Sequence, residues 1–456
     1  MVHFQLRELS IYEMLSLAVL FLLLSISSAS NLRRSSHLNK PYIKSADEGL
    51  HFSSILPTPE EWRKTFKDKV SDQRVSMEYS QPLILWMKCI DDELRGYFSF
   101  ERTDPDPHCG QMGVEMLINA NTMHNNVKLL VDGSPVSYMS DIGGQAFTAN
   151  ISAVTTSHVV VSIEGWVRYT AFPLSDCQQS SDFDNPVKIG QPRNPKLVII
   201  ANTPDTFNIS QKSLFTRMVS NHLLYHRCAL GIQGYEVIVQ HDHIDKYLQN
   251  PQLRQFFDLG WITLVTKPFR PARRQLPKDY VWQSLYENLA ILRHWKKDVY
   301  LLNFDPDEYL VYSADKFTNS SQFRDLIFSH SNLVIDRYNT HCLTGCKHDR
   351  IDGAISFTSP RTYGKEKMLT LVRYPKIIYD VEKNSCSYVH YMTCRTGDDI
   401  RLDNNTAYML HFENLLLFRE KTNFTEKNDL LEAVDLNHPL LKICNPAHPD
   451  AKIMKY

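Results

Sequence analysis

An excess of charge of either sign is missing from this sequence, because 50 Lys and Arg stand against 51 Asp and Glu, a formal net charge of -1. A broad cationic surface, the usual source of non-specific nucleic-acid affinity, is therefore excluded, and we expect no nucleic-acid partner. A Gly-x4-Gly-Lys phosphate loop is also missing, which argues against a P-loop enzyme. Any anionic ligand must then be bound by a local group of side chains.

Long apolar runs are equally scarce. The one such run extends from Met14 to Ile26, and small residues follow it from Ser27 to Ser30. It is shorter than the ~20 residues that cross a bilayer, and the small residues resemble a signal-peptidase site. Residues 1–30 are therefore predicted to be a cleaved secretory signal or an uncleaved signal anchor, which would then be the chain's membrane contact. We expect the rest of the chain in the secretory pathway, in the Golgi lumen.

The cysteines and glycosylation sequons agree with that compartment. Nine cysteines fit an oxidising environment in which most are paired and at least one is left over. No Cys-x2-Cys pair occurs, and neither Cys342-x3-Cys346 nor His241-Asp242-His243 has the spacing of a structural zinc site. Sequons of the form Asn-x-Ser/Thr begin at Asn150, Asn208, Asn319, Asn404 and Asn423.

The length of 456 residues exceeds what one hydrophobic core supports, so more than one domain is expected. Residues 31–77 are polar and are predicted to form a stem. Residues 78–180 contain short alternating apolar runs between turn signals, which predict a small all-β, sandwich-like domain. Aromatic side chains in this stretch either stack on sugars or form the core. They are Trp86, Tyr97, Phe98, Phe100, Trp166 and Tyr169.

From residue 196 the pattern changes to alternating strands and helices. Near-continuous apolar runs at 197–201, 235–239, 261–265 and 299–304 indicate strands buried on both faces of a parallel sheet. The intervening stretches at 211–230 and 280–295 each carry one apolar helical face. These features predict a doubly wound α/β fold whose ligand crevice lies at the carboxyl ends of the strands.

An acidic motif, Asp305-Pro306-Asp307-Glu308, follows the last of these strands. Successive residues of an extended chain point in opposite directions, so Asp305 and Asp307 are expected to present their carboxylates on the same side. Two such oxygen donors suit Mg2+ or Mn2+, which would act as a Lewis acid on a departing nucleoside diphosphate. The alternative is a solvated acidic turn.

The segments 283–293 and 298–310 together resemble the central block of glycosyltransferase family 92, in which a Gln-led helix precedes a strand ending in Asp-x-Asp-Glu-Phe. Tyr309 stands where that family has Phe. Further pieces resemble the family in the same order, between residues 196 and 419. They are Asn221 to His226, Leu230-Gly231, Lys367, Arg373 to Lys376, Val389-His390 and Met409 to Phe412.

The resemblance implies a GT-A fold, a Rossmann-like nucleotide-diphospho-sugar transferase domain, over residues 196–440. It also implies inverting, metal-dependent transfer of a sugar, galactose from UDP-galactose, onto a glycan or polysaccharide acceptor. In plant members a carbohydrate-binding module lies beside the catalytic domain, which makes residues 78–180 a candidate for such a module.

Individual roles follow from the same resemblance. Asp305 and Asp307 would bind Mn2+ or Mg2+ and the donor, and either His390 or His411 would complete the metal shell. For both histidines a hydrogen-bonded structural role is the alternative. Lys367 would neutralise phosphate, unless it is a solvated lysine, and Asp242 would contact the uracil or ribose of a UDP-sugar.

Inversion requires a general base that takes the proton of the acceptor hydroxyl, ordinarily Asp or Glu. Asp336, Asp349 and Asp352 are candidates without a ranking, and each has a loop cap or salt bridge as its alternative role. Two other functions compete with the transferase. One is a non-catalytic glycan-binding protein that retains the GT-A fold, and the other is a metal-dependent hydrolase or phosphotransferase using the same acidic pair.

Overall fold

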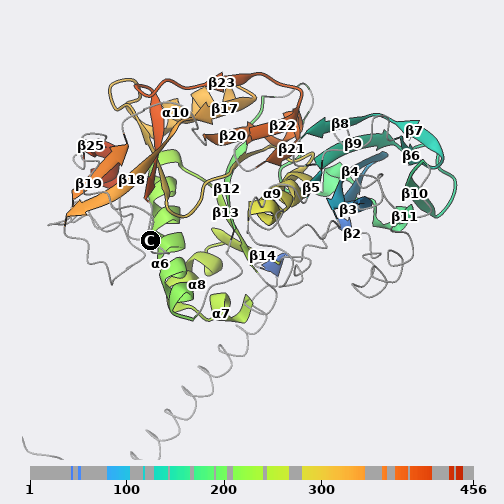
Figure 1. Cartoon of the computed structure of the whole chain (residues 1–456), viewed down its shortest axis with the longest axis horizontal. Coiled ribbons are helices and arrows are strands. Elements are labelled where there is room, and N and C mark those ends of the chain that lie inside the picture. Colours follow the sequence, from blue (N-terminus) through green and yellow to red (C-terminus); the bar gives the residue numbers. More distant parts are fainter. Residues whose placement is uncertain are drawn as a thin grey trace, which may run out of the picture. The chain divides into compact units, whose positions relative to one another are not determined.

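Figure 1 shows the computed structural model of the chain, which is divided into two units, Met1–Ile43 and Lys44–Tyr456. The short strand β1 (Ile43–Lys44) spans the boundary between them. The structure describes residues 43–44, 50–52, 80–102, 117–118, 128–141, 144–164, 169–188, 190, 192–202, 209–239, 244–266, 280–344, 362–366, 375–388, 391–412, 431–435 and 438–444. The predicted signal or anchor (1–30) and most of the predicted stem (31–77) lie outside these residues. No helix within the described part of the chain is long and apolar enough to cross a membrane.

The β-rich part of the chain consists of two antiparallel sheets. The first has the order β2-β3-β4-β9-β8, with β5 paired to β4, and the second has the order β11-β10-β6-β7. Their strands are β2 (Leu50–Phe52), β3 (Ser80–Ile90), β4 (Glu93–Arg102), β5 (Leu117–Ile118), β6 (Leu129–Val131), β7 (Ser134–Val136), β8 (Tyr138–Asp141), β9 (Gly144–Asn150), β10 (His158–Ile163) and β11 (Tyr169–Pro173). The short 3-10 helices η3 (Leu174–Asp176) and η4 (Ser180–Asp182) follow.

One core joins these two sheets. Met87 and Phe147 from the first sheet share it with Leu129, Val159 and Phe172 from the second. A disulfide between Cys89 and Cys177 ties β3 to the segment after η3. The short runs of this part therefore contribute strands to two antiparallel sheets that share one core.

The α/β part is built on a sheet with the strand order β14-β13-β12-β15-β20-β17-β23. The strands predicted from the apolar runs are β12 (Lys196–Asn202), β13 (Gly234–Val239), β14 (Ile262–Thr266) and β15 (Val299–Leu302). They pair in parallel, which confirms the prediction. The sheet then becomes mixed, because β20 (Lys376–Asp380) runs antiparallel to both β15 and β17 (Asn332–Ile335), and β23 (Asp399–Arg401) runs parallel to β17.

Helices separate the strands of this part. They are α6 (Ile209–Leu230), α7 (Ile244–Leu248), α8 (Pro251–Asp258), α9 (Tyr280–His294), α10 (Ser320–Phe328) and α11 (Pro439–Cys444). Met218, Tyr225 and Ala229 of α6 share a core with Val311 and Leu410 of a second sheet. A disulfide between Cys228 and Cys444 joins α6 to α11.

This second sheet has the order β16-β24-β18-β19-β25. Its strands are β16 (Glu308–Tyr312), β18 (Arg337–Thr344), β19 (Thr362–Glu366), β24 (Ala407–Phe412) and β25 (Leu431–Ala433). The 3-10 helix η6 (Val381–Lys383) and the hairpin of β21 (Asn384–Tyr388) and β22 (Tyr391–Arg395) follow β20. Since β15 belongs to one sheet and β16 to the other, the residues between them lie where the chain passes from the first sheet to the second.

The β-rich and α/β parts share buried contacts within Lys44–Tyr456. Helix α9 contacts both β3 and β4, and Trp86 and Tyr97 from those strands belong to one core cluster with Leu289 of α9. The Lys88 ammonium donates to the Arg293 carbonyl at 3.1 Å. Because Trp86 and Tyr97 are buried, their rings are core side chains, whereas Tyr169 is exposed. The side chains of Phe98, Phe100 and Trp166 lie outside what the structure describes.

Candidate active site

The acidic motif forms a turn between β15 and β16. The Glu308 amide donates to the Asp305 carbonyl at 2.9 Å, and residues 306 and 307 are turn residues. The expectation of an extended chain with alternating side chains is therefore wrong. The reason is local, because proline at the second position of a turn and aspartate at the first are both favoured by the backbone geometry. The motif still lies at the carboxyl end of β15, where ligands of open α/β sheets bind.

Asp305 pairs with a buried lysine. The Lys376 ammonium donates to Asp305 Oδ2 at 2.6 Å and lies 3.0 Å from Glu308 Oε2. The Lys376 side chain is 0% exposed, whereas that of Asp305 is 34% exposed. Lys376 is the first residue of β20, the antiparallel neighbour of β15, so the mixed part of the sheet supplies the ammonium group that pairs with Asp305. The turn is thus not the solvated acidic turn that the sequence left open.

Glu308 is the second carboxylate of this group and is fully buried. Its Oε2 accepts the Asp305 amide at 2.9 Å, and its Oε1 lies 3.1 Å from Nη1 of Arg337, the first residue of β18. Both carboxylate oxygens therefore have a positively charged partner, Lys376 on one side and Arg337 on the other.

Asp307 faces a histidine. Its Oδ2 lies 3.6 Å from His411 Nε2, and the other ring nitrogen of His411, Nδ1, is 3.1 Å from Asn339 Oδ1. His411 belongs to β24 and lies opposite Glu308 in the antiparallel pairing of β16 with β24. Of the two histidines predicted as metal ligands, His411 therefore lies beside the acidic motif, and His390 lies outside the described residues.

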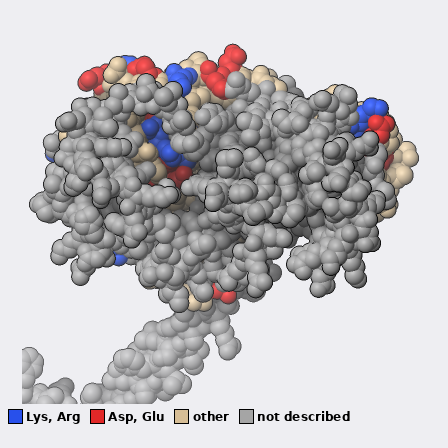
Figure 2. All heavy atoms as spheres, in the orientation of Figure 1, with Lys and Arg blue, Asp and Glu red and all other residues tan. Residues whose placement is uncertain are grey.

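The pKa values of the group reflect burial and pairing together. Burial raises the pKa of Asp305, but the Lys376 ammonium outweighs it and the net pKa is lowered. Burial raises the pKa of Glu308. Burial favours a neutral Lys376 and a neutral His411, yet Asp305 and Asp307 respectively raise the pKa of each. Figure 2 shows Lys or Arg atoms next to Asp or Glu atoms among the described residues of the α/β part.

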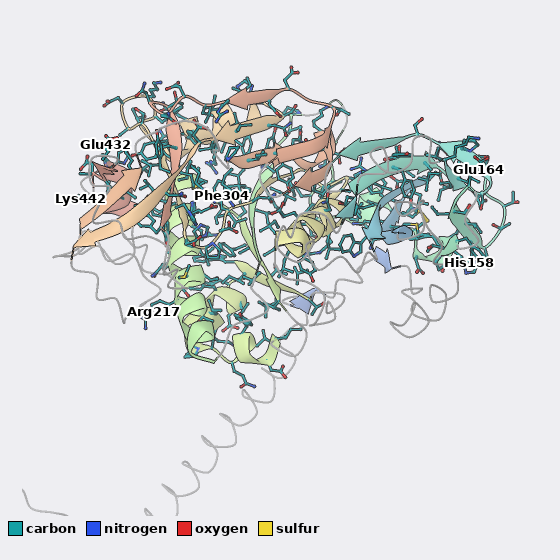
Figure 3. All side chains as sticks on the ribbon, viewed as in Figure 1. His158, Glu164, Arg217, Phe304, Glu432 and Lys442 are labelled. Carbon is teal, nitrogen blue, oxygen red and sulfur yellow. A yellow bond between two sulfur atoms is a disulfide. The ribbon has the colours of Figure 1, made fainter. Side chains whose placement is uncertain are left out.

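Two histidines of α6 form hydrogen bonds with the backbone of the motif and of β16. His222 Nε2 lies 2.7 Å from the Glu308 carbonyl, and its Nδ1 lies 2.9 Å from the Tyr235 hydroxyl on β13. His226 accepts the Leu310 amide at 3.4 Å, and its ring lies 5.5 Å from that of Phe304, which Figure 3 labels beside α6. Burial lowers the pKa of both histidines, so both are neutral near pH 7. They anchor the start of β16 to the helix.

The other predicted site residues do not all join this group. Asp336 is buried between β17 and β18, and its Oδ1 accepts Arg401 Nε at 2.9 Å. Asp242, Lys367, Asp349, Asp352 and His390 lie outside the described residues. Within the described ranges, no set of three or more His, Cys, Asp or Glu side chains is arranged to hold a metal ion.

The roles of Lys376 and Arg337 were not predicted from the sequence. Each is the first residue of a strand, and the strand that begins at Lys376 is otherwise apolar until Asp380. A lysine at the head of a fully buried strand predicts an internal carboxylate partner, since lysine is almost never fully buried unless it is paired. The sequence alone offers only the short apolar stretch after Lys376, and the burial that makes the signal decisive is seen in the folded chain.

Comparisons with known proteins add little to this geometry. No protein-family model matches the chain, and no curated protein matches it. A solved structure of UDP-glucose pyrophosphorylase from Acinetobacter baumanii is similar over 48% of this chain and 85% of that chain, with 10% identity and a TM-score of 0.23. So low a TM-score defines neither the fold nor the activity of this chain. The chain is a mixed α/β protein with multi-stranded sheets, and its resemblance to glycosyltransferase family 92 stays a prediction.

Proposed function

We propose that the chain is an inverting, divalent-metal-dependent glycosyltransferase of family 92 with a GT-A domain over residues 196–440. The proposed donor is UDP-galactose, and the proposed acceptor is a glycan or polysaccharide. The observation that supports this proposal is the turn that carries Asp305 and Asp307 at the carboxyl end of parallel strand β15. Lys376 forms an ion pair with Asp305, and Arg337 forms one with Glu308. A protein that only binds glycans does not need such an acidic pair at the carboxyl end of a parallel strand.

The residues present fit a divalent cation. Asp305 and Asp307 supply carboxylate oxygens that are partly exposed, at 34% and 22% of each side chain. Mg2+ and Mn2+ are commonly bound by one or two carboxylates together with substrate phosphates and water. Asp305 and Asp307 would hold the cation, and His411 and His390 are proposed as further ligands, because the described side chains do not by themselves form a set of three ligands. When bound, the cation would neutralise charge on the departing nucleoside diphosphate.

The chain's own residues prepare this site. Lys376 and Arg337 balance the negative charge of the Glu308 carboxylate. The Glu308 side chain in turn accepts a hydrogen bond from the Asp305 amide. This arrangement fixes the turn, so the two aspartates are positioned before any ligand arrives. Lys367 and Asp242 are proposed contacts to phosphate and to uracil or ribose.

The general base is proposed from the same three aspartates, Asp336, Asp349 and Asp352. The Asp336 carboxylate binds the Arg401 guanidinium, which favours the salt-bridge role for this residue. A base must accept a proton from the acceptor hydroxyl, and Oδ1 of Asp336 already accepts a hydrogen bond from Arg401.

Location and organisation complete the proposal. Residues 1–30 would be a signal or signal anchor, residues 31–77 a stem, and residues 78–180 a β-rich domain that is a candidate carbohydrate-binding module. The disulfides Cys89–Cys177 and Cys228–Cys444 favour an oxidising compartment, and the Golgi lumen is the proposed site of action.

The test measures UDP release by the full chain, made in a secretory host, from a panel of nucleotide sugars with and without Mn2+. Mn2+-dependent release from UDP-galactose is expected, and Asp307→Asn should reduce it at least about a hundredfold, since a ligand to the catalytic charge is lost. Asp258→Asn, an exposed change on α8, is the matched control and should leave the rate unchanged. If the unaltered chain neither turns over nor binds UDP, the glycan-binding alternative replaces the transferase.

A further inference from the structure

Two permanent positive charges lie inside the acidic site. The Lys376 ammonium lies between Asp305 Oδ2, at 2.6 Å, and Glu308 Oε2, at 3.0 Å. Arg337 Nη1 lies 3.1 Å from Glu308 Oε1. With Asp307 the group holds three carboxylates, so Lys376 and Arg337 offset two of their three negative charges.

These positive charges cannot move away to make room for a ligand. The Lys376 and Glu308 side chains are both 0% exposed, and that of Arg337 is 13% exposed. Separating a buried ion pair leaves an uncompensated charge and is strongly unfavourable. Lys376 is also the head of β20, which is held on both sides by β15 and β17. Its charge is therefore a fixed part of the site.

A divalent cation arriving alone meets only a weakly attractive field, because Lys376 and Arg337 offset most of the negative charge of the group. It must bind beside Lys376 and Arg337, and one oxygen of Asp305 already accepts a hydrogen bond from Lys376. A nucleoside diphosphate brings several negative charges, which both the cation and the two basic side chains attract. At the effective dielectric constant of a protein, one unit charge acting on a divalent ion a few ångströms away changes its affinity on the order of tenfold or more.

We propose that Lys376 couples the two ligands, so that the divalent cation binds tightly only together with the nucleoside diphosphate. This inference rests on the proposed function, because it concerns the ligands of the same site. Lys376 is a positioning residue in this scheme, since it is fully buried and acts through Asp305 and Glu308. Thermodynamic linkage requires that UDP then binds more tightly in the presence of the cation by the same factor.

The test titrates the full chain with Mn2+ and follows the free Mn2+ signal by electron paramagnetic resonance, with and without UDP. In the unaltered chain UDP should tighten Mn2+ binding at least about tenfold. Lys376→Met removes one positive charge and should tighten the binding of Mn2+ alone by a similar factor. The factor by which UDP tightens Mn2+ binding should therefore be smaller in this variant. Glu308→Gln removes one negative charge and should weaken the binding of Mn2+ alone.

A double variant keeps the comparison interpretable if Lys376→Met does not fold. Lys376→Met/Glu308→Gln removes the buried pair and restores the net charge of the unaltered site, so its Mn2+ affinity should lie near that of the unaltered chain. Compared with Glu308→Gln alone it differs only at Lys376, and it should bind Mn2+ at least about tenfold more tightly. Circular dichroism of each variant verifies the fold.

Each outcome decides a separate point. If Mn2+ alone binds the unaltered chain as tightly as it does with UDP, or if removing Lys376 leaves Mn2+ affinity unchanged in both backgrounds, the coupling role of Lys376 is wrong while the transferase proposal stands. If UDP does not bind at any Mn2+ concentration, the proposed function fails and the coupling fails with it.

Discussion

The guanidinium of Arg95 lies over the ring of Trp295, with 4.5 Å between the guanidinium carbon and the ring centroid. Arg95 belongs to β4 of the β-rich part, and Trp295 directly follows α9 of the α/β part. Both residues are buried. Lys296, the next residue, forms an ion pair with Glu93 at 2.7 Å. The two parts are therefore joined by a buried, specific contact.

The first prediction concerns this junction. Trp86→Ala should lower the free energy of unfolding by about 3–5 kcal/mol, because Trp86 is a fully buried member of the core that α9 shares with β3. Tyr169→Ala is the matched control, since this aromatic is 58% exposed, and it should change stability by no more than about 0.5 kcal/mol. Urea unfolding followed by far-UV circular dichroism measures both free energies. Equal effects of the two changes would show that the shared core contributes nothing.

The second prediction is that buried histidines make the fold sensitive to acid. Burial lowers the pKa of His226 to about 3 from its ordinary 6.5. The unfolded chain therefore takes up a proton below pH 6.5 that the folded chain refuses, and stability falls between pH 6.5 and pH 3. At pH 5.5 one such histidine costs about 1.4 kcal/mol relative to pH 7.5.

The measurement compares the free energy of unfolding at pH 7.5 and pH 5.5. In His226→Gln the loss between the two pH values should be smaller by about 1.4 kcal/mol, whatever the absolute stability of the variant. His158→Gln changes an exposed histidine and should leave the loss as it is in the unaltered chain. An identical pH dependence in all three proteins would contradict a neutral, buried His226.

The third prediction concerns the disulfide between Cys228 and Cys444, which joins residues 216 positions apart. Closing so long a loop restricts the unfolded chain, so Cys228→Ser/Cys444→Ser should lower the free energy of unfolding by about 2–5 kcal/mol. Cys89→Ser/Cys177→Ser, which opens a shorter loop of 88 positions, should cost a similar or slightly smaller amount. Peptide mapping without reductant verifies both pairs. Recovery of Cys228 as a free thiol in the folded, unreduced protein would refute this pairing.

The strands of the parallel sheet could be predicted because each is buried on both faces and is therefore apolar over most of its length. The runs at 197–201 and 235–239 lie inside β12 and β13. The mixed half of the sheet was not predictable in this way. β20 begins with Lys376 and ends with Asp380, so its charged ends conceal a buried strand. Its pairing with β15 is a contact between segments far apart in the sequence.

The candidate site was predicted only in part for a similar reason. The position of Asp305 and Asp307 after a parallel strand could be read locally, as could Pro306 at the second position of the turn. The charge balance around them could not, because Arg337 and Lys376 come from separate strands that meet only in the folded chain. A local pattern therefore predicts where the site lies, and tertiary pairing determines its electrostatics.

The last prediction separates the two roles open to Asp336. Its carboxylate is buried and accepts Nε of Arg401, whose side chain is 53% exposed. We expect this pair to be structural, so Asp336→Asn and Arg401→Met should lower the free energy of unfolding by similar amounts, about 1–3 kcal/mol each. The transfer rate of both variants should stay within a few-fold of the unaltered chain under conditions where both are folded, because loss of a general base costs about a hundredfold or more. The proposed galactose transfer, measured beside thermal unfolding, tests this directly. A hundredfold loss of rate in Asp336→Asn with full activity in Arg401→Met would instead make Asp336 the base, whereas retained activity in both directs the search to Asp349 and Asp352.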